Sequence, residues 1–120
     1  MGSSKAERNL ARVLHAHGFR RNYPVSITKD SKPINIDIFH FAKHVWIESD
    51  GRWHFMQLKD GHEFAAAQAK DAAIEQEAIK RNILLIRVNN DKFNIDEQLA
   101  FIFMHMNEWD GKAGKVVKLY

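Results

Sequence analysis

Carboxylate side chains occupy unusual positions in two neighbouring strand-like segments of this sequence. Asp37 lies between two isoleucines in the alternating run INIDIFHF (34–41), although aspartate is disfavoured inside strands. Glu48 lies near the end of the next run, HVWIES (44–49), and shares one face with Asp50, the residue that follows this run. If both faces of the sheet are covered, these carboxylates need a proton, a basic partner or a cation, and a divalent metal ion is a common solution. The alternative is an acidic cluster that faces solvent.

A histidine and an aspartate farther along the chain could form a proton-transfer pair. His54 follows the strand-like run 44–49 across a glycine. Asp71 falls within the apolar stripe of an alanine-rich helical segment, 63–82, which predicts an inward-facing side chain that needs a donor partner. A carboxylate on one ring nitrogen of His54 would make the other nitrogen a better base. The alternative places Asp71 on an exposed helix surface.

The elements that must position these side chains can be predicted from turn residues and apolar periodicity. The order is a helix at 5–17, strands at 22–28, 34–41 and 44–49, a helix at 63–82, a strand at 83–88, a helix at 94–109 capped by Asn94, and a short strand within 110–120. The first three strands read as an antiparallel meander, and the strand–helix–strand unit after them implies a parallel crossover. The sequence therefore predicts a mixed sheet flanked by helices, in the α/β to α+β range. Glu7 completes the capping box SKAE (4–7), which alone would account for it.

Composition narrows the class of protein. The 120 residues fit a single domain, 1–120, and the absence of cysteine excludes disulfide scaffolds, zinc ribbons and cysteine nucleophiles. No apolar run is long enough for a membrane span, and the N-terminus lacks the apolar core of a signal peptide. We therefore expect no membrane partner and a cytoplasmic location. The net charge of +3 is compatible with a polyanionic partner.

Taken in chain order, these residues resemble the very-short-patch-repair-like branch of the PD-(D/E)xK nucleases. This branch includes phage homing endonucleases of the Glu-Asp-x-His-Asp class. The residues that carry the resemblance are Glu7, Asp37, the stretch ESDGRWH (48–54), Asp71 and the run ILLIRV (83–88). The resemblance covers about residues 4–90 and implies a restriction-endonuclease-like αβββαβα core. It also allows a phage- or virus-encoded protein acting in a host cytoplasm.

The resemblance implies a metal site made of oxygen ligands. Asp37 would be the central Mg²⁺ ligand, and the carbonyl group of Ser49 or the side chain of Glu48 would complete the protein part of the site. Glu7 would act on the metal through a water molecule. Mn²⁺ would be able to replace Mg²⁺.

The resemblance also implies a base and the residue that orients it. His54 would activate the attacking water, and Asp71 would hold the imidazole. One departure is that Asp50 stands where the wider superfamily has its lysine, so the motif itself supplies no lysine. His54 must then take that role, unless Lys59 or Lys70 reaches the site from elsewhere.

These expectations predict that the protein is a metal-dependent DNA endonuclease or nickase, which could be the catalytic domain of a homing or repair enzyme. We expect phosphate contacts from Arg20, Arg21, Arg52 and Lys59. Two alternatives stay open: a nucleic-acid-binding or dimerisation module without activity, and a nuclease for RNA or branched junctions. In segment 98–106 apolar residues nearly encircle the predicted helix, which favours a homodimer.

Overall fold

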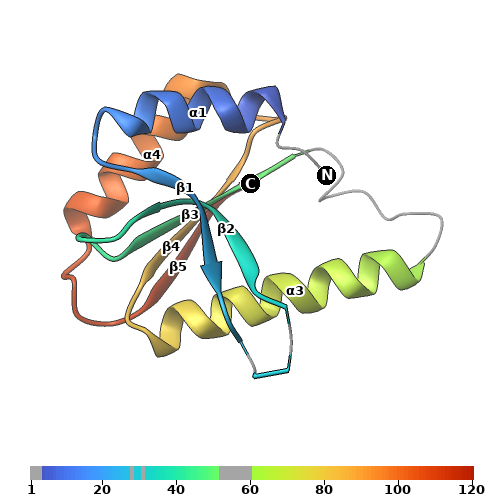
Figure 1. Ribbon diagram of the computed structural model, residues 1–120. Helices are drawn as coiled ribbons and strands as arrows, with labels where there is room; N and C mark the ends of the chain where they lie inside the picture. The colour runs from blue at the N-terminus through green and yellow to red at the C-terminus, as the bar shows by residue number, and fades with distance from the viewer. Residues whose placement is uncertain (1–3, 28, 31, 52–60) are drawn as a thin grey trace.

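The computed structural model describes residues 4–27, 29–30, 32–51 and 61–120. Their elements, in chain order, are α1 (Lys5–His15), β1 (Arg20–Val25), β2 (Ile34–His40), β3 (Val45–Asp50), α3 (Gly61–Lys80), β4 (Leu84–Asn89), α4 (Ile95–Glu108) and β5 (Lys115–Leu119) (Figure 1). The predicted order of helices and strands is confirmed, and the ends of the elements shift by a few residues at most.

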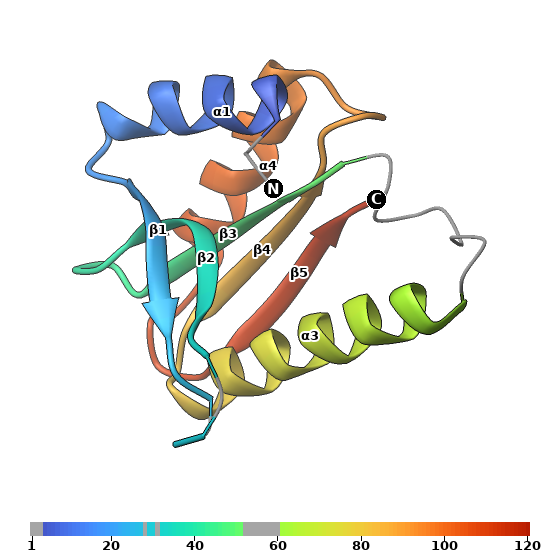
Figure 2. The same ribbon diagram turned by 45° about the vertical axis from the view of Figure 1, so that its right-hand side comes forward.

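The five strands form one mixed sheet in the order β1-β2-β3-β4-β5 (Figure 2). β1, β2 and β3 are antiparallel neighbours, and β4 pairs in parallel with both β3 and β5. The predicted meander and the parallel crossover through α3 are therefore confirmed. The protein is an α+β protein with a mixed sheet flanked by helices.

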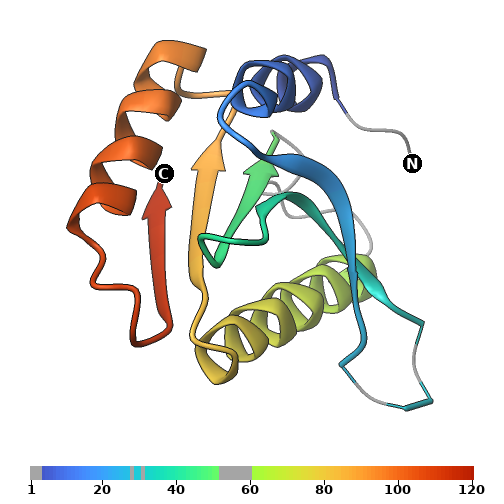
Figure 3. The same cartoon turned by 60° about the vertical axis from the view of Figure 1, so that its left-hand side comes forward.

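The helices cover both faces of the sheet, as Figure 3 shows, with α3 on one face and α1 and α4 on the other. Val45 and Ile47 of β3 pack into the core under α1 and α4, while Trp46 packs against Ile74 and Ala78 of α3. This alternation matches the period of two that separates the faces of a strand. Every residue of β3 is buried, so its acidic end lies in a covered sheet and not in an exposed one.

Both predicted helix caps are present. The Ser4 hydroxyl group accepts a hydrogen bond of 3.1 Å from the amide group of Glu7. Asn94 and Glu97 form a reciprocal capping box, with bonds of 2.8 and 3.0 Å. None of the helices in the described ranges has the length and apolarity that crossing a membrane requires.

The first two strands change direction at one point. Asn22 has a φ of 61°, in the left-handed region, and its neighbours pair around it with β2 on either side of Asp37. As a result, Ile38 packs under α1 and α4, whereas Ile34 and Ile36 pack on the α3 face. Strict alternation along 34–41 predicts that all three isoleucines share one face; this prediction is wrong, because the kink reverses the alternation at Asp37.

Candidate active site

The central feature is the meeting of β2 and β3 at Asp37 and Glu48. Backbone pairing between these strands covers residues 38–40 and 45–47. Beyond it, side chains bond to the backbone: the Asp37 amide group donates to Glu48 Oε2 at 2.8 Å, and the Ser49 amide group donates to Asp37 Oδ2 at 2.9 Å. The two carboxylates are thus held side by side by the strands that carry them, as the sequence pattern suggested.

The electrostatics of this pair favour a bound cation or proton. Burial and the nearby charge of Glu7 raise the pKa of Asp37 to about 6. Burial and the charge of Asp37 raise the pKa of Glu48 well above its usual range. Hydrogen bonds from amide groups oppose both shifts but do not cancel them. The two carboxyl groups therefore titrate as a coupled pair whose doubly charged form is costly.

This cost predicts a pH-dependent stability without metal ions. The pKa of Asp37 is higher in the folded protein than its ordinary 3.8, so the folded state binds this proton more tightly than the unfolded state does. The resulting stabilisation of the folded state is fully present below pH 3.8 and is lost as the pH rises through about 6. Raising the pH from 5 to 8 should lower the free energy of unfolding by about 1 kcal/mol from this group. Urea unfolding in EDTA at several pH values would measure it. The Asp37→Asn variant should lack this component; an identical pH profile in both proteins would contradict the assignment.

Glu7 of α1 lies near Asp37 and Glu48 and forms an ion pair with Arg21. It is buried, and its Oε2 accepts a hydrogen bond of 2.9 Å from Arg21 Nη2. Glu7 therefore contributes its amide group to the helix cap and its carboxylate to an ion pair. Arg21, which was expected to contact DNA phosphates, has a side chain that is 34% exposed and that ties β1 to α1 through this ion pair. The expected phosphate contact of Arg21 stays a prediction.

Arg87 of β4 organises the acidic residues on the α3 face. It has no exposed surface, and its Nη1 lies 3.5 Å from Asp50 Oδ2 while its Nε lies 3.0 Å from Glu75 Oε2. Its Nη2 donates to the carbonyl oxygen of Asp71 at 3.2 Å and lies 3.6 Å from Asp71 Oδ1. Burial acts to lower the pKa of Arg87, but the charges of Asp50 and Asp71 outweigh it and raise that pKa.

The location of Asp71 agrees with one part of the prediction. Its side chain turns from α3 towards the sheet, where Arg87 is among its partners. The predicted contact with His54 falls outside the described residues, as do the expected roles of Arg52 and Lys59. Asp50 is held by Arg87 and by the Tyr120 hydroxyl group, which donates to Asp50 Oδ2 at 2.7 Å.

Arg87, Glu75 and Tyr120 were not among the predicted site residues. Arg87 carried a signal, because it is the one charged residue in the run ILLIRV (83–88). A cation in a fully buried strand requires nearby anions. Glu75 lies one helical turn after Asp71, so the same reasoning would have found it. Tyr120 had no comparable signal in the sequence.

The remaining predicted residues are placed as follows. Ser49 lies beside the pair, and its hydroxyl oxygen accepts a 2.8 Å hydrogen bond from Asn90 Nδ2. Arg20 is exposed, and its Nη1 donates to the carbonyl oxygen of Phe19 at 2.8 Å. Across the described ranges, no group of three or more histidine, aspartate or glutamate side chains is arranged to hold a metal ion. A metal at Asp37 and Glu48 would need main-chain oxygens or waters as further ligands.

Comparison with known protein families, with curated proteins and with solved structures finds no match for this chain. The case for a function therefore depends on the geometry and electrostatics of the acidic pair and of the residues around it.

Proposed function

We propose that this protein is a Mg²⁺-dependent DNA endonuclease or nickase built on a restriction-endonuclease-like αβββαβα core. The observation that carries the proposal is the pair formed by the partly buried Asp37 and the buried Glu48, held together by hydrogen bonds to backbone amide groups, with both pKa values raised. Two neighbouring carboxylates repel each other when both are charged, so they are suited to binding a divalent cation that neutralises them.

The sheet topology supports the finer fold assignment. A helix, a three-stranded antiparallel meander, a helix and a parallel fourth strand follow one another in chain order. This arrangement is the one implied by the resemblance noted in the sequence. The pair lies on β2 and β3, the second and third of the five strands, where residues from several elements can act together.

The donor set fits Mg²⁺ better than a softer metal. Asp37, Glu48 and the main-chain carbonyl group of Ser49 offer only oxygen, and Mg²⁺ commonly binds through one or two carboxylates while keeping several waters. Each carboxylate uses one oxygen for the backbone hydrogen bonds, so Asp37 Oδ1 and Glu48 Oε1 are the atoms proposed as ligands. When bound, Mg²⁺ would neutralise charge on the scissile phosphate, and Mn²⁺ would substitute for it.

The remaining chemistry falls to residues of the chain. His54 would take a proton from the attacking water, whose oxygen bonds to phosphorus while the bond to the leaving sugar oxygen breaks. Asp71 would orient His54 while it also contacts Arg87. The network of Asp50, Arg87 and Tyr120 would keep the end of β3 rigid beneath the substrate. Glu7, neutralised by Arg21, would adjust the charge around Asp37.

DNA binding would depend mainly on phosphate contacts. The net charge is +3, and Arg20 and the lysines of the C-terminal segment (Lys112, Lys115 and Lys118) are exposed. Such contacts bring little sequence preference and a steep dependence on salt. Arg52 and Lys59 would add to them.

Incubation of the protein with supercoiled plasmid over a titration of Mg²⁺ tests the proposal. We expect nicked plasmid to accumulate with Mg²⁺ or Mn²⁺, none with EDTA, and weaker activity at higher salt. Ca²⁺, which binds oxygen ligands with looser geometry, is the matched control ion. Absence of nicking with every divalent ion, on plasmid and on short duplexes alike, would contradict the nuclease function.

A further inference from the structure

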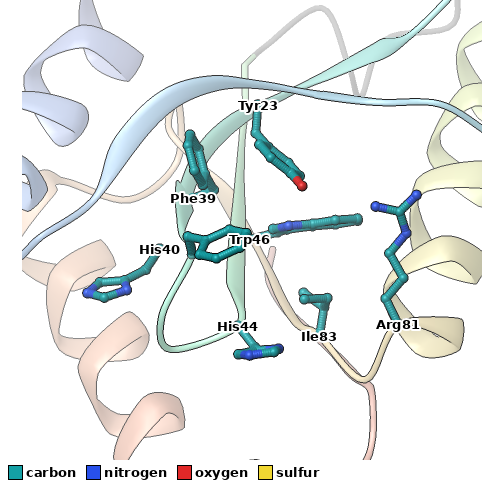
Figure 4. Close-up of a pocket in the computed structure, with 8 residues that line it drawn as sticks. Tyr23, Phe39, His40, His44, Trp46, Arg81 and Ile83 are labelled. Atoms are coloured by element: carbon teal, nitrogen blue, oxygen red, sulfur yellow. The ribbon is translucent and has the colours of Figure 1, made fainter.

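A second feature of the α3 face is a pocket beside the start of β3. It has a volume of about 180 Å³ and lies between the β2–β3 turn and the end of α3, as Figure 4 shows. Its lining is mostly aromatic and includes Tyr23, Phe39, Phe41, His44, Trp46 and Arg81. Pockets that bury drug-sized molecules usually have roughly 300–1,000 Å³, so this one suits a single small ring system.

The inner wall of the pocket is a preassembled aromatic surface. Tyr23 lies 4.7 Å from Phe39 and 6.3 Å from Trp46, measured between ring centroids. Trp46 is almost completely buried, and Figure 4 shows it between Tyr23 and Ile83. Rigid rings recognise flat ligands at a low cost in conformational entropy.

The outer rim consists of residues that packing alone does not explain. Phe41 is 76% exposed, more than any other large apolar side chain in the described ranges. His44 is also exposed and has a φ of 58°, a left-handed conformation in which a glycine would be less strained. The turn is closed by a 3.3 Å hydrogen bond from the His44 amide group to the Phe41 carbonyl oxygen. The turn thus keeps two exposed rings at the pocket at some cost in stability.

Arg81 provides a cation on the opposite side of the pocket. Its Nε donates to Glu77 at 2.8 Å, and its Cζ lies 6.0 Å from the centroid of the Trp46 ring. Because the bond to Glu77 is made by Nε, the terminal nitrogens Nη1 and Nη2 are the atoms that would meet an anion. A guanidinium group beside aromatic rings matches a planar base attached to a phosphate.

The pocket and the acidic pair lie along the same strand. Trp46 and Glu48 are two residues apart in β3 and share its α3 face, a separation of roughly 7 Å along the strand. The exposed rim of the pocket, at Phe41 and His44, precedes the start of β3, whereas Glu48 lies near the end of that strand.

We propose that this pocket binds one unstacked base of a single-stranded nucleic acid, with the base against the exposed rings of Phe41 and His44, the buried Trp46 forming the floor, and its phosphate at Arg81. A base in a duplex is already stacked on its neighbours, so the pocket favours single-stranded or frayed segments. The choice of a nucleic acid as the ligand rests on the proposed function. The site itself is separate from the catalytic residues.

The test measures binding without cleavage, by fluorescence anisotropy in EDTA with the Asp37→Asn protein as the parent. The probes are fluorescein-labelled oligothymidine, an abasic strand of the same length, and a duplex of that length. We expect the parent to bind oligothymidine more tightly than the abasic strand, and Phe41→Ala to weaken oligothymidine binding roughly five- to a hundredfold. Met104→Ala, which removes another exposed apolar side chain from α4, is the matched control and should change nothing.

Two further variants separate binding from folding. His44→Gly should relieve the strained turn and raise the melting temperature while it weakens oligothymidine binding. Arg81→Met should weaken the binding of the abasic strand and of oligothymidine to a similar extent, because both probes carry phosphates.

Equal affinity of the parent for oligothymidine and the abasic strand, or full affinity in Phe41→Ala, would overturn the pocket proposal. If the parent still binds the duplex, either result leaves the nuclease proposal intact. Base-dependent binding that Phe41→Ala removes would support the pocket proposal even if plasmid nicking failed. If the parent binds none of the three probes, the pocket proposal is overturned.

Discussion

The Asp37→Asn variant is expected to lose Mg²⁺-dependent nicking of supercoiled plasmid by about 10³-fold or more. A divalent ion supplies several kcal/mol of charge stabilisation in the transition state, and each ~1.4 kcal/mol is a factor of ten in rate. Asparagine is close in shape to aspartate and keeps an oxygen that can accept the hydrogen bond from the Ser49 amide group. The loss should therefore come from the missing charge and not from unfolding.

The same substitution should leave the fold intact and stabilise it above pH 6, because it removes one of two neighbouring carboxylates that repel each other. Asp96→Asn, which changes an exposed aspartate on α4, is the matched control and should keep full activity. Circular dichroism would verify the fold of both variants. Wild-type nicking by a folded Asp37→Asn protein would mean that a different centre performs the reaction.

Replacing Arg87 by methionine should have the largest effect on stability, about 3–5 kcal/mol. The substitution removes the cation that Asp50, Asp71 and Glu75 share and leaves Asp50 buried beside Glu48 without its neutralising partner. A loss of this size should appear in urea unfolding as a clear shift of the midpoint. The end of β3 would lose its support, so nicking should also decline at temperatures where the variant is folded.

Arg12→Met is the control for Arg87→Met, since Arg12 is an exposed arginine on α1 and its loss should cost within about 0.5 kcal/mol. A second comparison isolates the cause. Adding Asp50→Asn to Arg87→Met should recover part of the lost stability, because it removes the charge that had become uncompensated. If Arg87→Met unfolds at the wild-type urea midpoint, the acidic residues do not depend on this cation.

Much of the fold could be predicted because local patterns and global packing agree. Alternation placed Trp46 and Glu48 on one face of β3, the cap at Asn94 was recognisable from its side-chain chemistry, and the long helix before a short apolar strand indicated a parallel crossover. Asp71 could be placed facing the sheet because a charge interrupts an apolar helical stripe. In each case a short stretch of sequence contains the physical cause.

The remaining features depend on contacts between distant segments. The kink at Asn22 depends on a left-handed residue opposite Asp37, which alternation within β2 does not reveal. The partners of Glu7 and Asp50 are Arg21 and Arg87, which are 14 and 37 residues away in the chain. Pairing of this kind is decided by the tertiary structure, so the sequence showed that the carboxylates were unusual without showing what neutralises them.

Binding of Mn²⁺ to the free protein, followed by calorimetry at pH 6 in buffers of different ionisation enthalpy, tests the central claim most directly. We predict one Mn²⁺ per chain, competition by Mg²⁺, and release of protons on binding, because the pKa of Asp37 is raised to about 6 and a carboxylate ligand must be deprotonated. Asp37→Asn should abolish both the binding and the proton release. Equal Mn²⁺ binding by the wild type and Asp37→Asn, or binding by neither, would contradict a metal site at Asp37 and Glu48.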